Sequence, residues 1–199
     1  MKTRTKALLL VMSALLLIVS TVFATMAYLT STTEKITNTF TVGNVAITLD
    51  EADLVDEYGV ADNSVPRVIS NEYKLIPGHT YDKDPTIHVK SGSEACYLFV
   101  KVVDQLDDIQ DTATVVAQMT ANGWTPVSGA ENVWAYNNIV DARTSAQDVT
   151  VFTYFKVKGT ANVADYAGKT ITVQAYAVQA DGFANAIAAW EAAPCSWGP

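Results

Sequence analysis

The residues best suited to metal or acid–base chemistry are His79 and His88, the only two histidines among the 199 residues. A zinc peptidase of the common type needs the pattern H-E-x-x-H, in which two histidines one helical turn apart bind the metal and the glutamate acts as a base. Neither histidine is followed by glutamate, and the two fall in a predicted turn and a predicted strand. No nucleophile elbow, phosphate-binding loop or dinucleotide-binding glycine pattern is present. The sequence therefore predicts no catalytic residue, no metal ligand and no cofactor, and we expect a protein that is not an enzyme.

Acidic residues gather in segments 50–57, 82–84 and 104–111, where closely spaced oxygen ligands could bind Ca²⁺. The spacing of the EF-hand loop is absent, so a solvated acidic surface is the simpler interpretation. In the third segment the negative charge also precedes a predicted helix, where the helix dipole favours it. Aromatic residues could similarly form a sugar-binding platform, although core packing or subunit contact is their more common use: Trp124, Trp134, Tyr136, Trp190 and Trp197.

The two cysteines, Cys96 and Cys195, could form one disulfide in an exported chain. Cys96 begins an apolar predicted strand and Cys195 lies in the C-terminal tail, so a bridge would tie the tail to a sheet. It would close a loop of about 100 residues and be worth roughly 4–5 kcal/mol in the loop-entropy model. Alternatively, Cys96 is a buried small hydrophobic residue and Cys195 is exposed. The sequence leaves both states open.

The first 27 residues have the pattern of an export signal. Three basic residues precede residues 7–27, which are apolar or small and carry no charge. Small residues near the end of this run approximate a cleavage signal, and we predict that a signal peptidase cuts between Ala27 and Tyr28. A helix of about 20 residues can also span a bilayer, so a retained transmembrane anchor is the alternative. The Ser and Thr residues in the run, and the lack of a basic cluster after it, favour cleavage.

The part beyond the leader is acidic. Residues 1–27 hold three basic and no acidic residues, so that 10 basic residues face 21 acidic ones in the remainder, a net charge of −11. Such a surface repels nucleic acids and anionic membranes, and no nucleic acid partner is expected. This remainder is long enough for a sizeable core and has no low-complexity linker, which predicts a single domain.

Short β-strands separated by turns are expected over most of the chain. Residues that suit strands, mainly Val, Thr, Ile, Tyr and Phe, alternate with polar residues. Strands are predicted at 40–49, 86–90, 97–103, 149–158 and 170–179, with weaker ones at 67–75 and 133–138. Helices are predicted at 112–122 and 181–193, and Pro77 and Gly78 have the residue types of a type II turn. Many short strands, one or two short helices and no regular βαβ alternation predict a mainly β fold of the β-sandwich type.

Six segments carry a family resemblance: 25–31, 36–47, 75–79, 86–90, 96–102 and 175–183. Each alone is a weak signal, and the N-terminal segments are specific as a combination. In this combination the chain resembles the TasA/camelysin family of exported bacterial fibre and biofilm-matrix proteins. The resemblance implies a jelly-roll-like β-sandwich after an N-terminal signal or transmembrane helix, and processing by a dedicated signal peptidase. It also implies a secreted protein at the cell surface or in the biofilm matrix. The expected partners are further copies of the chain, joined head to tail in a fibre, and other matrix or anchor proteins.

In that family, the segment that leader cleavage frees inserts as a strand into the next subunit. Here the resemblance places a donor strand at residues 28–42, between a signal peptide at 1–27 and a β-sandwich domain at 43–199. In such strand addition, main-chain hydrogen bonds hold the strand and alternate side chains fill pockets. One face of the segment is largely apolar, and threonines occupy the other face; the first face carries Ile36, Asn38, Phe40 and Val42. The alternative is that residues 33–42 form the first strand of their own sandwich.

We therefore expect an exported structural subunit of an extracellular fibre or biofilm matrix. A monomeric cell-surface module that binds sugar or calcium is the alternative function. An anchored metallopeptidase, which only the family name suggests, ranks third because the zinc-binding pattern is missing.

Overall fold

The structure is a computed structural model that describes residues 3–29, 43–195 and 197. The chain divides into two compact units, residues 1–41 and residues 42–199. The first unit contains helix α1 (Thr3–Leu29), whose side chains are exposed over residues 3–19. None of the helices in the described part of the chain combines the length and the apolar character that a membrane span requires.

The longest strands of the second unit form the centre of a four-stranded sheet. β6 (Cys96–Asp104) and β11 (Ile171–Gln179) pair antiparallel along their whole length. On the other side of β6 lies β8 (Val133–Tyr136), which also pairs with β7 (Trp124–Pro126). The strand order is β11-β6-β8-β7, and every pairing is antiparallel.

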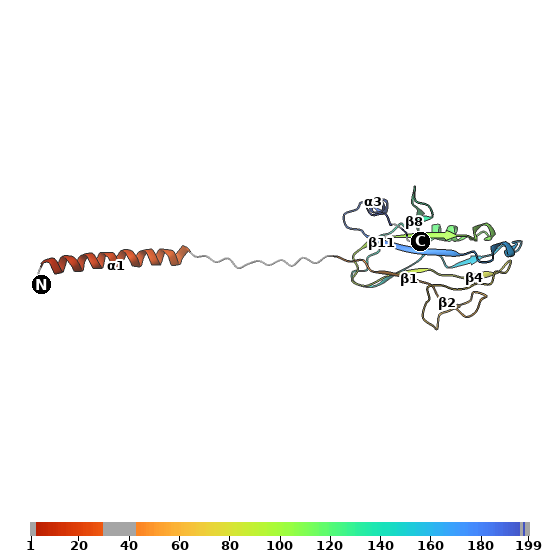
Figure 1. The fold of residues 1–199 in the computed structure, drawn as a ribbon, viewed down its shortest axis with the longest axis horizontal. Coiled ribbons are helices and arrows are strands. Elements are labelled where there is room, and N and C mark those ends of the chain that lie inside the picture. The colour runs from red at the N-terminus through yellow and green to blue at the C-terminus, as the bar shows by residue number, and fades with distance from the viewer. Residues whose placement is uncertain (1–2, 30–42, 196, 198–199) are drawn as a thin grey trace. The chain divides into compact units, whose positions relative to one another are not determined.

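A second layer of strands faces this sheet (Figure 1). In it, β5 (Thr86–Val89) lies between β1 (Ile47–Asp50) and β9 (Gln147–Thr150). β4 (Thr80–Asp82) pairs with β10 (Tyr154–Lys156), and the short β2 (Asp53–Leu54) pairs with β3 (Ala61–Asp62). The described residues thus form eleven strands in four sheets, which confirms the predicted mainly β class.

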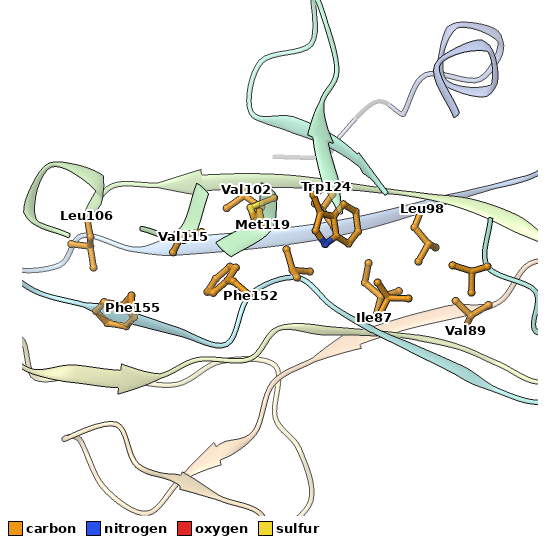
Figure 2. Close-up of a cluster of buried hydrophobic side chains, with 14 of the residues drawn as sticks. Ile87, Val89, Leu98, Val102, Leu106, Val115, Met119, Trp124, Phe152 and Phe155 are labelled. Atoms are coloured by element: carbon orange, nitrogen blue, oxygen red, sulfur yellow. The ribbon is translucent and has the colours of Figure 1, made fainter. Parts of the chain in front are cut away.

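The main core lies between the two layers (Figure 2). Alternate residues of β6 point into it, and they meet buried side chains of β5, β9 and β10. The intervening residues of β6, such as Phe99, point to the opposite face of the sheet and join a second apolar cluster. Helix α3 (Ala186–Ala192) and the C-terminal tail cover that second cluster. β6 is therefore buried on both faces, which explains its nearly continuous apolar sequence.

The helices are shorter than the predicted segments because capping side chains set where they begin. α2 (Val115–Ala121) follows Thr114, whose side chain accepts a hydrogen bond from a backbone N–H of the first turn, and α3 follows Asn185 in the same way. Gly123, with φ of 87°, ends the α2 segment as expected for a residue after a helix C-terminus. Two 3₁₀ helices, η1 (Asp107–Ile109) and η2 (Val163–Tyr166), lie in loops.

The prediction of one strand over residues 149–158 is wrong, because the structure divides this segment into β9 and β10. Val151 and Phe152 are both completely buried, and a regular strand cannot point two successive side chains into the same core. β9 pairs with β5, whereas β10 pairs with β4. The change of partner occurs at Val151, whose N–H donates to the carbonyl of Pro85, in the connection between β4 and β5. The predicted strand at 67–75 is also wrong, since the structure gives that segment only an isolated bridge from Val68 to Glu51, the residue after β1.

Pro77 and Gly78 occupy the centre of a tight turn. The His79 N–H donates to the Ile76 carbonyl at 3.2 Å, and Gly78 has φ of 79°. A type II turn requires positive φ at its third residue, which glycine adopts without strain.

Both cysteines are free, so the structure does not form the disulfide between Cys96 and Cys195 that the sequence allowed. Cys96 points into the main core, and burial raises the pKa of its thiol to about 11. Cys195 lies next to Tyr176, whose ring packs against the second cluster on the other face of the sheet. Because successive side chains of a strand point to opposite faces, the sheet itself separates the two thiols.

Candidate functional site

Two sheet edges meet along one side of the second unit. β11 is the edge strand of the four-stranded sheet, β1 is an edge strand of the facing layer, and the two strands contact each other. Among the strands of the described residues, β11 pairs only with β6 and β1 pairs only with β5. Each strand therefore has one side whose backbone groups belong to no ladder, which is how a sheet edge accepts another strand.

The free edge of β11 is formed by its core-facing residues. The Gln105 N–H donates to the Thr170 carbonyl at 3.0 Å, and the Ala180 N–H donates to the Ala95 carbonyl at 2.7 Å. Hydrogen-bonded pairs alternate along an antiparallel ladder, so the even-numbered residues of β11 exchange hydrogen bonds with β6. The odd-numbered residues, beginning at Ile171, consequently direct their N–H and C=O groups to the free edge.

The apolar side chains at these two edges are only partly covered. They pack against the main core but stay partly exposed, whereas the core-facing residues of β6 are at most 6% exposed. The core is thus closed in its middle and open along one side. We call this open side the seam and define it by Val45, Ile47, Leu49, Ile171, Val173, Ala175 and Ala177.

At one end the seam widens into a groove of about 960 Å³. The strands reach it with Leu49 of β1 and residues 171–173 of β11. Apolar and aromatic side chains make much of its lining, together with two lysines and three acidic residues: Tyr73, Leu75, Leu106, Phe155, Val163, Tyr166, Lys83, Lys169, Asp50, Glu51 and Glu72. The groove therefore offers apolar contacts beside a sheet edge whose free side pairs with no other strand in residues 43–195.

One wall of the groove is segment 67–75, which Arg67 anchors to the second layer. The Arg67 guanidinium contacts the Asp50 carboxylate at 2.5 Å and the Asp84 carboxylate at 2.8 Å, and it donates to the Asp84 carbonyl at 2.9 Å. Burial alone would raise the pKa of Asp50, but the hydrogen bonds from Arg67 and His88 lower it below its ordinary value. Two backbone hydrogen bonds of 2.8 Å between Val68 and Glu51 extend the anchor.

His88 joins three strands through its ring nitrogens. Its Nε2 lies 2.8 Å from the Asp50 carboxylate on β1, and its Nδ1 lies 2.7 Å from the Asp148 carboxylate on β9. Burial lowers the pKa of His88, but the two carboxylates raise it more, so the net shift is upward. This histidine therefore acts as an ionic bridge across the layer.

A second polar cluster is buried in the groove wall. Lys83 Nζ lies 2.5 Å from Glu51 Oε2, and Asn71 Nδ2 donates to Glu51 Oε1 at 3.0 Å. The side chains of Lys83 and Glu51 are only 10% and 6% exposed. Lys83 Nζ also lies 5.6 Å from the centre of the Tyr73 ring. Burial, and next the charge of Glu51, raises the pKa of Tyr73.

The predicted donor residues Ile36, Asn38, Phe40 and Val42 lie outside the described residues. Ala27 and Tyr28, at the predicted cleavage site, belong to the last turn of α1. The structure describes the sheet edges of β1 and β11 but not the predicted donor segment.

The acidic segments make internal contacts. Asp104 accepts hydrogen bonds from the Gln110 amide at 2.6 Å and from the Leu106 N–H at 2.8 Å, and Asp111 pairs with Lys156 at 2.8 Å. In the part of the chain that the structure describes, no three His, Cys, Asp or Glu side chains are grouped so as to hold a metal ion.

The tryptophans pack within the protein. Trp124 is 1% exposed and lies in the main core (Figure 2). Trp190 lies over Phe99 with ring centroids 5.2 Å apart and stacks on Trp197 at 6.2 Å. These contacts are core packing, which the sequence analysis set against a sugar-binding platform.

Sequence reasoning missed both the groove and the cluster of Glu51, Asn71 and Lys83. The three side chains come from separate segments with no common motif. The alternation in residues 170–179 did predict the strand, but an edge strand and a central strand can share that pattern.

Comparisons with family models, with curated proteins and with solved structures found no match. A functional assignment therefore depends on the seam, the groove and the family resemblance of the sequence.

Proposed function

We propose that this protein is an exported, non-enzymatic structural subunit that forms an extracellular fibre or biofilm matrix by strand insertion. In this proposal the fold is a jelly-roll-like sandwich, and leader cleavage after Ala27 frees residues 28–42. That segment enters the seam of the next copy. The resemblance to the TasA/camelysin family supports the same assignment.

The observation that carries the proposal is the seam itself. A row of partly exposed apolar side chains lies beside backbone groups of two sheet edges that pair with no further strand among the described residues. An inserted strand would satisfy those groups and cover the apolar side chains. Each large side chain that the donor buries would contribute about 1.5–3 kcal/mol, and Ile36, Phe40 and Val42 are the apolar residues on one donor face.

The ends of β1 favour insertion between copies over insertion within one copy. The groove opens beside Leu49, near the C-terminal end of β1, whereas the chain arrives at its N-terminal end through Gly43 and Asn44. That arrival point is fixed, because the Glu94 N–H donates to the Asn44 carbonyl at 3.0 Å. The groove and the point where the chain enters β1 thus lie at opposite ends of that strand, which suits a head-to-tail contact that repeats from copy to copy.

The first test compares a protein that starts at Tyr28 with one that starts at Val42. Negative-stain electron microscopy should show fibres of the first and none of the second, with both folded by circular dichroism. If the longer protein stays monomeric and the shorter one unfolds, residues 28–41 complete their own sandwich and the proposal is wrong.

Paired substitutions test the two halves of the contact separately. Phe40→Asp should abolish fibres by spoiling the donor face, while Thr41→Asp on the opposite donor face should preserve them. Val173→Asp should abolish fibres by spoiling the seam, while Gln174→Asp, at an exposed neighbouring position of β11, should preserve them.

A mixing experiment separates failed assembly from general damage. The Phe40→Asp protein retains its seam and the Val173→Asp protein retains its donor strand. Their mixture should give heterodimers in analytical ultracentrifugation but no fibres. Absence of any heterodimer from two folded variants would count against strand insertion at the seam.

The size of the groove favours one second candidate, a monomeric binding module. Ligand pockets commonly measure about 300–1,000 Å³, and the groove falls in this range with Tyr73, Tyr166 and Lys83 in its lining. In that case Val173→Asp would abolish ligand binding, and the protein that starts at Tyr28 would remain monomeric.

A further inference from the structure

We propose that Lys83 and Asn71 become joined by a side-chain amide bond, with Glu51 as the residue that moves the protons. The protein would thus carry a self-catalysed covalent cross-link in the wall of its groove. This inference stands on the buried cluster alone and does not depend on the proposed fibre assembly.

The geometry supplies the three parts of such a reaction. One carboxylate, that of Glu51, contacts the amine through Oε2 at 2.5 Å and the amide through Oε1 at 3.0 Å. The nucleophile and the carboxamide are therefore held by the two oxygens of a single group. The Asn71 amide nitrogen also donates to the Ala52 carbonyl at 2.8 Å, which fixes the orientation of the amide.

The backbone holds the amine in place as well. Lys83 follows β4 directly, and its own N–H donates to the Thr153 carbonyl at 3.1 Å. Its side chain is nearly buried beside the Tyr73 ring. Holding two reactants in a fixed geometry removes much of the entropic barrier of a bimolecular reaction.

Burial also favours the neutral products over the charged reactants. A buried ion pair loses the solvation of both charges, and its attraction often fails to compensate for that loss. Forming an amide removes the charge of Lys83, and the new N–H stays beside the Glu51 carboxyl group as a hydrogen-bond donor. The amide is therefore better suited to this buried position than a lysine ammonium is.

The reaction balances without an oxidant or a cofactor. Glu51 takes a proton from the Lys83 ammonium, and the free amine attacks the side-chain carbonyl carbon of Asn71. The Nζ–Cγ bond forms, and Glu51 passes that proton to Asn71 Nδ2 and takes a second proton from Nζ, so that Nζ keeps a single N–H. The Cγ–Nδ2 bond breaks, and the departing ammonia accepts the second proton from Glu51 and leaves as ammonium. Relative to the neutral chain the protein loses one NH3, about 17 Da.

The bond would connect two segments that line the groove. Asn71 belongs to the wall segment 67–75, and Lys83 belongs to the connection between β4 and β5. A covalent link between them would keep that wall in place when the protein is pulled or partly unfolded.

Tryptic peptide mapping of the denatured full chain tests the proposal. An unmodified chain gives peptides 68–74, 75–83 and 84–90. The cross-linked chain should give one branched product that joins 68–74 to 75–90, uncleaved at Lys83 and lighter than the sum of its parts by about 17 Da. Fragment spectra should place the branch between Asn71 and Lys83.

Three variants separate the cross-link from other losses of ammonia. Glu51→Gln and Lys83→Arg should each abolish the branched product, and Lys90→Arg, at an exposed position, should leave it intact. Cyclisation of Asn71 on its own backbone also releases ammonia, but it would persist in Lys83→Arg and give no branch. Recovery of the three linear peptides alone from the folded wild-type protein would overturn the proposal, whether or not fibres form.

Discussion

Replacing Gly59 with alanine should destabilise the protein far more than the same change at a comparable glycine. Gly59 lies in the connection between β2 and β3 and has φ of 80°, a conformation that side chains rarely adopt. A Cβ at this position would lie 2.6 Å from Cδ1 of Tyr81. Gly92 has nearly the same φ, 84°, but a Cβ there would meet nothing within 4 Å.

Tyr81 has little room to move away from that new methyl group. It is completely buried, and its ring stacks on Phe155 with centroids 4.8 Å apart. Its hydroxyl accepts the Ile76 N–H and donates to the Lys74 carbonyl, both at 2.6 Å. The hairpin is also fixed from its other side, because the Asp82 N–H donates to the Gly59 carbonyl at 2.8 Å.

The two glycines share one cost and differ in another. A left-handed conformation costs a non-glycine residue about 1–2 kcal/mol, and this applies to both variants. Overpacking of a filled core adds about 1–3 kcal/mol, and this applies to Gly59→Ala alone. At about 2–4 °C per kcal/mol for a protein of this size, Gly59→Ala should melt roughly 2–12 °C below Gly92→Ala.

Thermal and urea unfolding of the full chain, followed by tryptophan fluorescence, would measure both variants against the wild type. Equal losses of unfolding free energy for Gly59→Ala and Gly92→Ala would refute the reasoning. Such a result would mean that Tyr81 shifts freely and that the hairpin is not packed against β4 as the contacts indicate.

Three further predictions concern single side chains of the second unit. Tyr81→Phe should lower the unfolding free energy by about 1–3 kcal/mol in urea titrations, since the partly buried Ile76 N–H and Lys74 carbonyl lose their partner; an unchanged midpoint would contradict this. The pKa of His88 is raised above its ordinary value of 6.5, so its stabilising charge is complete below that pH and is lost as the pH rises through the folded pKa. The difference in unfolding free energy between the wild type and His88→Asn should therefore shrink as the pH rises from about 6 towards 9, roughly the range in which a histidine of raised pKa titrates. A difference that does not change with pH would exclude the ionic bridge. A thiol reagent at neutral pH should label the partly exposed Cys195 in the native protein, but should label Cys96 only after denaturation, because that thiol is buried and its pKa is about 11; rapid labelling of both, or of neither, by mass spectrometry would contradict the cysteine assignment.

Local features of the fold could be predicted because they depend on a few neighbouring residues. The turn at Pro77 and Gly78 needs only a residue with fixed φ followed by one that tolerates positive φ. Helix α2 lies within its predicted segment, but Thr114 decides its first turn through a hydrogen bond that a propensity pattern does not locate. The error at residues 149–158 has the same origin, because a strand-forming sequence cannot indicate that the chain changes partner from β5 to β4.

The cysteine pair shows how a contact can fail for reasons that no local pattern reveals. Both thiols are compatible with a bridge in the sequence, and each lies near the same sheet in the structure. The alternation of side chains along β6 nevertheless directs Cys96 into the main core, while the tail around Cys195 packs on the other face of the sheet. A shift of β6 by a single residue would reverse that outcome.

The sequence by itself determined the mainly β class, the tight turn, the approximate positions of the helices and the acidic charge, because composition and short-range periodicity suffice for each. Only the tertiary structure decided that β1 and β11 are edge strands, that their apolar side chains line an open seam, and that Glu51, Asn71 and Lys83 share one buried cluster. The physical reason is that edges and clusters arise from pairings between residues far apart in the chain. Each strand carries its own alternation of apolar and polar residues, but its neighbours are chosen by the packing of the whole core.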